Sequence, residues 1–151
     1  MTFAAVGDTG YDVMVVVHIL FVMVGLAPMF VHPFLARQLI SADSPVVVGL
    51  LERMTRNGQM IYTPALVVGG FVGFGVAGMS DEVFKVSQPW LMTAVWVWIA
   101  MLGVYHGLMI PAEKALARGE EAAVRRLDLG GALVSVLLVI QLYLMVFKPG
   151  Q

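Results

Sequence analysis

Four apolar stretches, each about as long as a membrane span, set the limits on what this chain can fold into. They cover residues 13–36, 61–79, 90–110 and 129–147. A helix of about 20 apolar residues crosses the roughly 30 Å hydrocarbon core of a bilayer. Lipid offers no hydrogen-bond partners, so such segments are helices that satisfy their own backbone groups. We therefore predict an all-α integral membrane protein, a single domain over residues 1–151 with four transmembrane helices in an antiparallel bundle.

The composition supports the membrane assignment and excludes several kinds of site. Of the 151 residues, 60% are hydrophobic and 13% are charged, whereas a soluble domain is about half apolar and about a quarter charged. The net charge of -1 gives no electrostatic basis for nucleic-acid binding. The chain has no cysteine, which excludes disulfides, iron–sulfur clusters and thiolate zinc sites. A cofactor would have to be held by histidine, methionine, carboxylate or packing.

The basic residues are divided unequally between the two sides of the predicted bundle. On the side of the termini lie only Lys85 and Lys148. The others lie in the loops after the first and third spans: Arg37, Arg53, Arg56, Lys114, Arg118, Arg125 and Arg126. By the positive-inside rule these two loops are cytoplasmic. Residues 1–12 have no basic residue and so do not resemble a secretory signal. We expect a multi-pass protein of a bacterial cytoplasmic (inner) membrane, with both termini on the periplasmic side.

The loop after the first span contains a candidate helix of its own. Ser44 and Pro45 are typical of a helix start, with serine as N-cap and proline in the first turn, and Gly58 is typical of a helix end. The apolar residues between them recur on one face: Val46, Val47, Leu50, Leu51 and Met54. We predict a short amphipathic helix on the cytoplasmic surface between spans one and two.

Small residues follow a pattern that lets helices approach one another closely. The motif G-x-x-x-G occurs at Gly69 and Gly73 in the second span and at Gly103 and Gly107 in the third. Such a face packs against another helix backbone or against a flat ligand. Both interpretations stay open, and the first extends to a homo-oligomer or to a larger membrane complex.

Three histidines are the residues of the spans best suited to chemistry. No Asp, Glu, Lys or Arg lies inside the four predicted spans, which counts against ion transport and proton-coupled transport. His18, His32 and His106, in contrast, lie within spans or at their ends. His18, Gly25 and His32 are spaced seven apart, so they share one helix face. Gly25 leaves room there for a bulky planar group or for a neighbouring helix.

The depth of each histidine determines which of them can meet. Counted at about 1.5 Å per residue, His32 and His106 reach similar depths near the cytoplasmic side, whereas His18 lies toward the other side. Imidazoles from facing helices are typical ligands of haem b, so His32 and His106 are candidate axial ligands. The alternatives are that His32 contacts lipid headgroups and that His106 hydrogen-bonds to a neighbouring helix.

The 11 methionines support a further hypothesis, because methionine sulfur together with imidazole suits copper(I). Met14 lies four residues before His18, and Met29 lies three residues before His32, so each is beside a histidine on its helix. Methionine is also a common core residue. Copper handling is therefore a third interpretation of the chain.

Several short motifs follow one another along the chain: His18, Arg53, Tyr-Thr-Pro-Ala at 62–65, Trp-Leu at 90–91, Tyr-His-Gly at 105–107 and Lys-Pro at 148–149. This order resembles the HemJ-type protoporphyrinogen oxidase superfamily, small membrane proteins that include copper-resistance D-like relatives. The resemblance implies a bundle of membrane helices that binds haem b. It also implies that His18 is a haem ligand and that the Tyr-His-Gly pattern of the family falls on His106.

Two departures from the family bear on the activity. The oxidases carry an essential lysine after the tryptophan of span three, where this chain has Met-Thr-Ala-Val at 92–95, and an arginine late in span one, where it has His-Pro-Phe at 32–34. We therefore expect a haem b protein in redox chemistry or electron transfer, an oxidoreductase if it is an enzyme, rather than a protoporphyrinogen oxidase. The alternative is a cofactor-free accessory subunit of a larger membrane complex.

Overall fold

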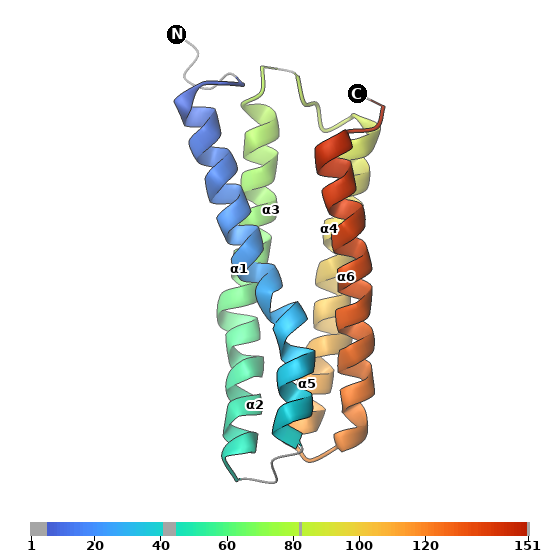
Figure 1. Ribbon diagram of the computed structural model, residues 1–151. Helices are drawn as coiled ribbons and strands as arrows, with labels where there is room; N and C mark the ends of the chain where they lie inside the picture. The colour runs from blue at the N-terminus through green and yellow to red at the C-terminus, as the bar shows by residue number, and fades with distance from the viewer. Residues whose placement is uncertain (1–5, 41–44, 82, 151) are drawn as a thin grey trace.

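The computed structural model describes residues 6–40, 45–81 and 83–150. Over these residues the chain forms four long helical rods that lie side by side (Figure 1). The prediction of an all-α fold with four helices long and apolar enough to cross a membrane is confirmed.

Two rods are nearly uninterrupted helices, and the other two contain one turn of π-helix. The first rod is α1 (Thr9–Ile40), and the fourth is the 3-10 turn η3 (Glu121–Ala123) followed by α6 (Val124–Phe147). The second rod consists of α2 (Pro45–Asn57), the π-turn η1 (Gly58–Tyr62) and α3 (Thr63–Gly78). The third rod consists of α4 (Pro89–Val104), the π-turn η2 (Tyr105–Met109) and α5 (Ile110–Ala117).

The two ends of the molecule differ in what they carry. The start of α1, the end of α6 and the connection between α3 and α4 lie at one end, which we call the terminal end (Figure 1). The end of α1, the start of α2 and the connection between α5 and α6 lie at the other. We call this second end the basic end, because it holds Arg37, Arg56, Lys114, Arg118 and Arg125.

The pairing of the rods changes along their length. Toward the terminal end α1 packs on α3, and α4 packs on α6 (Figure 1). Toward the basic end α2 packs on α5, and α1 packs on α6. Glycines allow two of these close approaches. A Cβ on Gly25 would lie 2.7 Å from the backbone nitrogen of Leu66, and one on Gly131 would lie 2.9 Å from Cγ of Pro33, so a larger residue at either position would push the helices apart.

The predicted helix end at Gly58 is wrong. Gly58 is buried and begins η1, so α2 runs on into α3 and continues its axis (Figure 1). Packing requires the glycine, because the hydroxyl of Tyr105 lies too close to the position of a Cβ on Gly58 for a larger residue to fit. Leu51 and Met54 of the predicted apolar face are buried. Ser44, the predicted N-cap, lies outside the described residues.

The third helix also continues beyond its predicted end at residue 110. Pro111 is the second residue after η2, and Pro64 is the second residue after η1. In an α-helix a proline ring clashes with the carbonyl four residues earlier, and in both rods that carbonyl belongs to the π-turn. A local π adjustment accommodates proline in membrane helices. Neither proline therefore ends its rod, and residues 111–117 become part of the bundle.

Candidate functional site

His18 lies on α1 against the glycine face of α3. Its Nδ1–H donates to the backbone carbonyl of Gly69 over 2.7 Å, and a Cβ on Gly73 would lie 2.8 Å from its Cε1. Because a carbonyl only accepts, the neutral ring carries its hydrogen on Nδ1 and keeps the lone pair of Nε2. A histidine that binds a metal through Nε2 has this arrangement, with its other nitrogen bonded to a carbonyl or carboxylate.

His32 has a buried partner that the sequence analysis did not identify. Its Nδ1–H donates to Oε1 of Glu113 over 2.6 Å, which joins α1 to α5. His32 is 5% exposed and Glu113 is fully buried. Among the described residues they are the only buried side chains of the types Asp, Glu, His, Lys and Arg. An ionisable pair inside a rod long and apolar enough to cross a membrane is costly to bury.

The signal for Glu113 was present in the sequence. The side chains three and four residues away from it on α5 and η2 are apolar: Met109, Ile110, Leu116 and Ala117. A helix that continued through Pro111 would therefore place Glu113 on a buried face. The predicted span ends at residue 110, and the sequence predicts only a cytoplasmic extension from there to Gly119, so Glu113 is not counted among the residues of the spans.

The second oxygen of Glu113 and the hydroxyl of Tyr105 are further buried polar atoms at the His32–Glu113 pair. The hydroxyl of Tyr105 and Oε2 of Glu113 are buried without a hydrogen-bond partner in the described residues. Both face Gly58, since the Tyr105 hydroxyl occupies the place of its missing Cβ and Oε2 would lie 4.0 Å from that atom. The ring of Tyr62 meets the ring of His32 edge-on, with 6.0 Å between centroids. The two π-turns thus bring tyrosines to the buried pair.

His106 lies on the exposed side of η2. The hydroxyl of Thr63 donates its one hydrogen to the carbonyl of Gly58 over 2.8 Å. It therefore accepts from Nε2–H of His106, 3.1 Å away. This is the hydrogen bond to a neighbouring helix that we considered for His106.

The three histidines have separate partners. His32 turns its Nδ1 inward to Glu113, whereas His106 is exposed and bonds to Thr63, so the structure does not bring the two rings together as paired ligands. No group of three His, Cys, Asp or Glu side chains able to hold a metal ion occurs in the described residues. Beside Gly25 lies the backbone of α3, so the neighbouring helix takes the space that we had also considered for a planar group.

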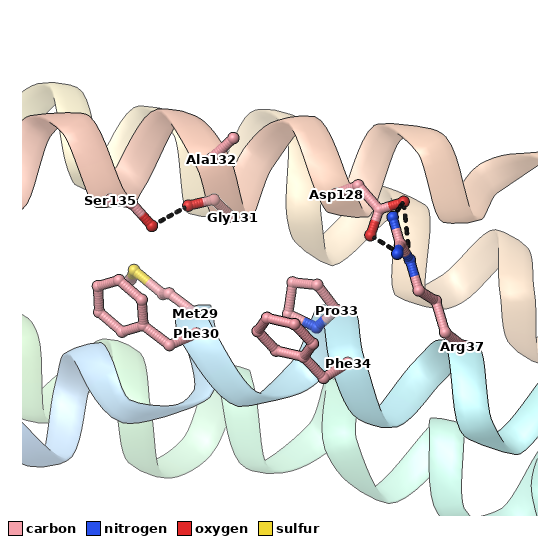
Figure 2. Close-up of a pocket in the computed structure, with 9 residues that line it drawn as sticks. All are labelled: Met29, Phe30, Pro33, Phe34, Arg37, Asp128, Gly131, Ala132 and Ser135. Carbon is pink, nitrogen blue, oxygen red and sulfur yellow. Dashed lines mark hydrogen bonds and ion pairs between the residues drawn. The ribbon is translucent and has the colours of Figure 1, made fainter.

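A groove of about 380 Å³ runs between α1 and α6 (Figure 2). Toward the basic end it is bounded by the ion pair of Arg37 and Asp128, with 2.7 Å between Nη2 and Oδ2. Its remaining lining is largely apolar, with Phe34 and Met29 on the α1 side and Ser135 on the α6 side. None of the three histidines lines it. Met29 is fully buried in the core, which is an ordinary packing role for methionine.

A second, polar groove of about 310 Å³ lies between α2 and α5 at the basic end. Its lining is Glu52, Thr55, Arg56, Gln59, Lys114, Ala117 and Arg118. Thr55 lies three residues before Gly58 and Ala117 lies four residues after Glu113, so they are about one helical turn from Gly58 and from Glu113 on the same helix faces. The lining of the polar groove therefore comes within about one helical turn of Glu113.

The chain was compared with protein-family models, with curated proteins and with solved structures. None of them matches it. The resemblance to HemJ-type oxidases stays a prediction, so the function must be argued from the chain's own residues.

Proposed function

We propose that the chain is a membrane-embedded haem b protein in redox chemistry or electron transfer, with His18 as the axial ligand. The observation that carries the proposal is the hydrogen bond from Nδ1 of His18 to the carbonyl of Gly69. That bond fixes the tautomer and the orientation that an iron ligand needs. The family resemblance of the sequence, which points to the same histidine, is the second support.

The residues around His18 fit haem in one respect and restrict it in another. A porphyrin supplies four nitrogens to the iron, so one axial histidine is enough protein ligation. The backbones of α1 and α3 touch at Gly25 and Leu66, which leaves no room for a porphyrin between these two helices. The proposal therefore requires the haem outside this contact, on the Nε2 side of the His18 ring. When bound there, haem would supply one-electron chemistry, while Gly69 and Gly73 hold the His18 ring in place.

The test is an ultraviolet–visible spectrum of the detergent-purified protein, produced with ample haem and recorded oxidised and then reduced. We expect a Soret band that is lost in His18→Ala and kept in His106→Ala. Gly73→Ala is a milder variant, because its Cβ would press on Cε1 of His18 and so shift the band. Gly75→Ala on the same helix is its control, since the nearest atom, Cε of Met14, would lie 3.9 Å away. A colourless protein, or a band that survives His18→Ala, would contradict the proposal.

A second candidate function, an accessory subunit of a larger membrane complex, is favoured by a different observation. Gly103 and Gly107 are exposed, and no atom would lie within 4 Å of a Cβ on either. This second G-x-x-x-G face is thus not used by the part of the chain that the structure describes, and such faces pack against other membrane helices. A colourless protein that copurifies with a stoichiometric membrane partner would favour this role over haem binding.

The proposed setting is a bacterial cytoplasmic membrane, crossed four times by an antiparallel bundle. The concentration of arginine and lysine at the basic end supports a cytoplasmic location for that end. The terminal end, with both termini, is then periplasmic.

A further inference from the structure

The His32–Glu113 pair is buried, ionisable and has no part in the proposed haem site. An ionised carboxylate in an apolar environment must be paired or must lose its charge. With neutral His32 and ionised Glu113 the pair carries one negative charge. One added proton makes it neutral, either as imidazolium and carboxylate or as imidazole and carboxylic acid. A buried pair without net charge costs less than a buried pair that carries a net charge.

We propose that His32, Glu113 and Tyr105 form a proton-exchange site that takes up and releases one proton through the polar groove at the basic end. On uptake, a proton from water in the groove joins the pair and removes its negative charge. On release, the same proton returns to water. No electron is transferred and no other bond changes, so the step needs no further reactant.

Two oxygens without hydrogen-bond partners support a path for protons between the pair and water in the polar groove. Oε2 of Glu113 and the hydroxyl of Tyr105 are buried, lack partners in the described residues and face the same place beside Gly58. Buried polar atoms of this kind are commonly bridged by a water molecule. The tyrosine hydroxyl both donates and accepts, so it can pass a proton between such a water and the carboxylate. Thr55 and Ala117, one turn away toward the basic end, belong to the lining of the polar groove.

The net charge of the site depends on the proton that the pair binds, because the charged side chains of the surrounding helices are exposed. On the elements packed around it, Tyr105 of η2 is buried, and Tyr62 of η1, whose ring meets that of His32, is partly buried. The exposed groups are Arg37 of α1, Glu52, Arg53 and Arg56 of α2, and Lys114 of α5. Asp128 of α6 pairs with Arg37. No second buried charge adjoins the pair in the described part of the chain.

The test uses histidine labelled with nitrogen-15, because the chain contains only three histidines. The full chain in lipid nanodiscs gives one set of ring signals for each, and single variants of His18 and His106 assign them. After transfer to D2O we expect the Nδ1 hydrogen of His32 to be replaced within minutes to hours. Its ring signals should also differ between acidic and alkaline buffer.

Variants separate exchange from simple loss of structure. Tyr105→Phe keeps the ring and removes the hydroxyl, and we expect it to slow the exchange at His32 by about tenfold, since one hydrogen-bonded step is lost. Glu113→Gln should abolish the difference between the His32 ring signals in acidic and in alkaline buffer. Glu120→Gln is the matched control, because Glu120 is an exposed acid at the basic end that pairs with Arg118. It should change neither the exchange rate at His32 nor the response of the His32 signals to buffer. Unchanged His18 and His106 signals show in the same spectrum that each variant is folded.

Two results would overturn the proposal. If the Nδ1 hydrogen of His32 is not exchanged after a day in D2O and the His32 signals are the same in both buffers, protons from water do not reach the pair. If Tyr105→Phe exchanges at the wild-type rate, the tyrosine is not on the route. Neither result depends on whether the protein holds haem, so failure of this proposal is distinct from failure of the haem proposal.

Discussion

At the scale of single residues, Glu113 shows what burial demands of an acid in this fold. Its carboxylate is fully buried and is bonded by a histidine from another helix. Removing one member of such a pair leaves the other unpaired, which costs more than losing both.

This asymmetry leads to a prediction about stability. We expect Glu113→Leu and His32→Leu each to lower the free energy of unfolding by about 3 kcal/mol. The double variant should lose clearly less than the sum, because neither ionisable group is then left alone. Unfolding by sodium dodecyl sulfate in mixed micelles, followed by tryptophan fluorescence, measures all three values. Strictly additive losses would show that the two side chains are not energetically coupled.

Residue patterns predicted some of these positions and missed others for a physical reason. The spacing of His18, Gly25 and His32 placed them on one helix, but their partners Gly69, Leu66 and Glu113 come from other rods. A local pattern does not contain contacts between rods. The pairing of His32 with Glu113 instead of His106 therefore had to come from the structure.

At the scale of elements, the two G-x-x-x-G faces and the glycines opposite them have different roles. Gly25 on α1 meets the backbone of Leu66 on α3, whereas Gly103 on α4 meets nothing within 4 Å. Packing thus requires a glycine at residue 25 of α1, whereas the described residues make no contact that requires one at residue 103 of α4.

The difference gives a matched pair of substitutions. Gly25→Ala should lower the free energy of unfolding by about 1–3 kcal/mol, because the added methyl group forces α1 away from α3. Gly103→Ala should leave it unchanged within about 0.5 kcal/mol. The same detergent unfolding measurement checks both. Equal losses would mean that the exposed face of α4 is also packed in the micelle, as expected for a self-associating protein.

The four apolar helices could be predicted because each is a long, uninterrupted apolar run, and the structure confirms them. The full extent of the second and third rods was not predicted. Gly58 and Pro111 normally mark helix ends, and the π-turns that carry the backbone past them have no recognisable sequence signal. The residues beyond those two points were consequently assigned to a separate surface helix or, like Glu113, to a cytoplasmic extension outside the span.

At the scale of the whole molecule, the uneven charge of the two ends predicts orientation. A reporter fused after residue 151 should be active only as a periplasmic reporter, such as alkaline phosphatase. One inserted at Gly119, a turn glycine with φ of 84° between α5 and η3, should be active only as a cytoplasmic one, such as green fluorescent protein. The physical reason is the retention of arginine-rich and lysine-rich loops in the cytoplasm. The opposite activities would reverse the proposed topology.

The position of the His32–Glu113 pair inside the bundle has an electrical consequence. A charge that crosses a whole membrane changes its energy by about 2.3 kcal/mol per 100 mV. A proton that enters the pair from the basic end crosses only part of that distance and so experiences part of the field. If the basic end is cytoplasmic, as proposed, it faces the negatively polarised side, and the membrane potential would draw this proton back out. Energising the membrane would then lower the occupancy of the proposed exchange site, and the site would be sensitive to voltage.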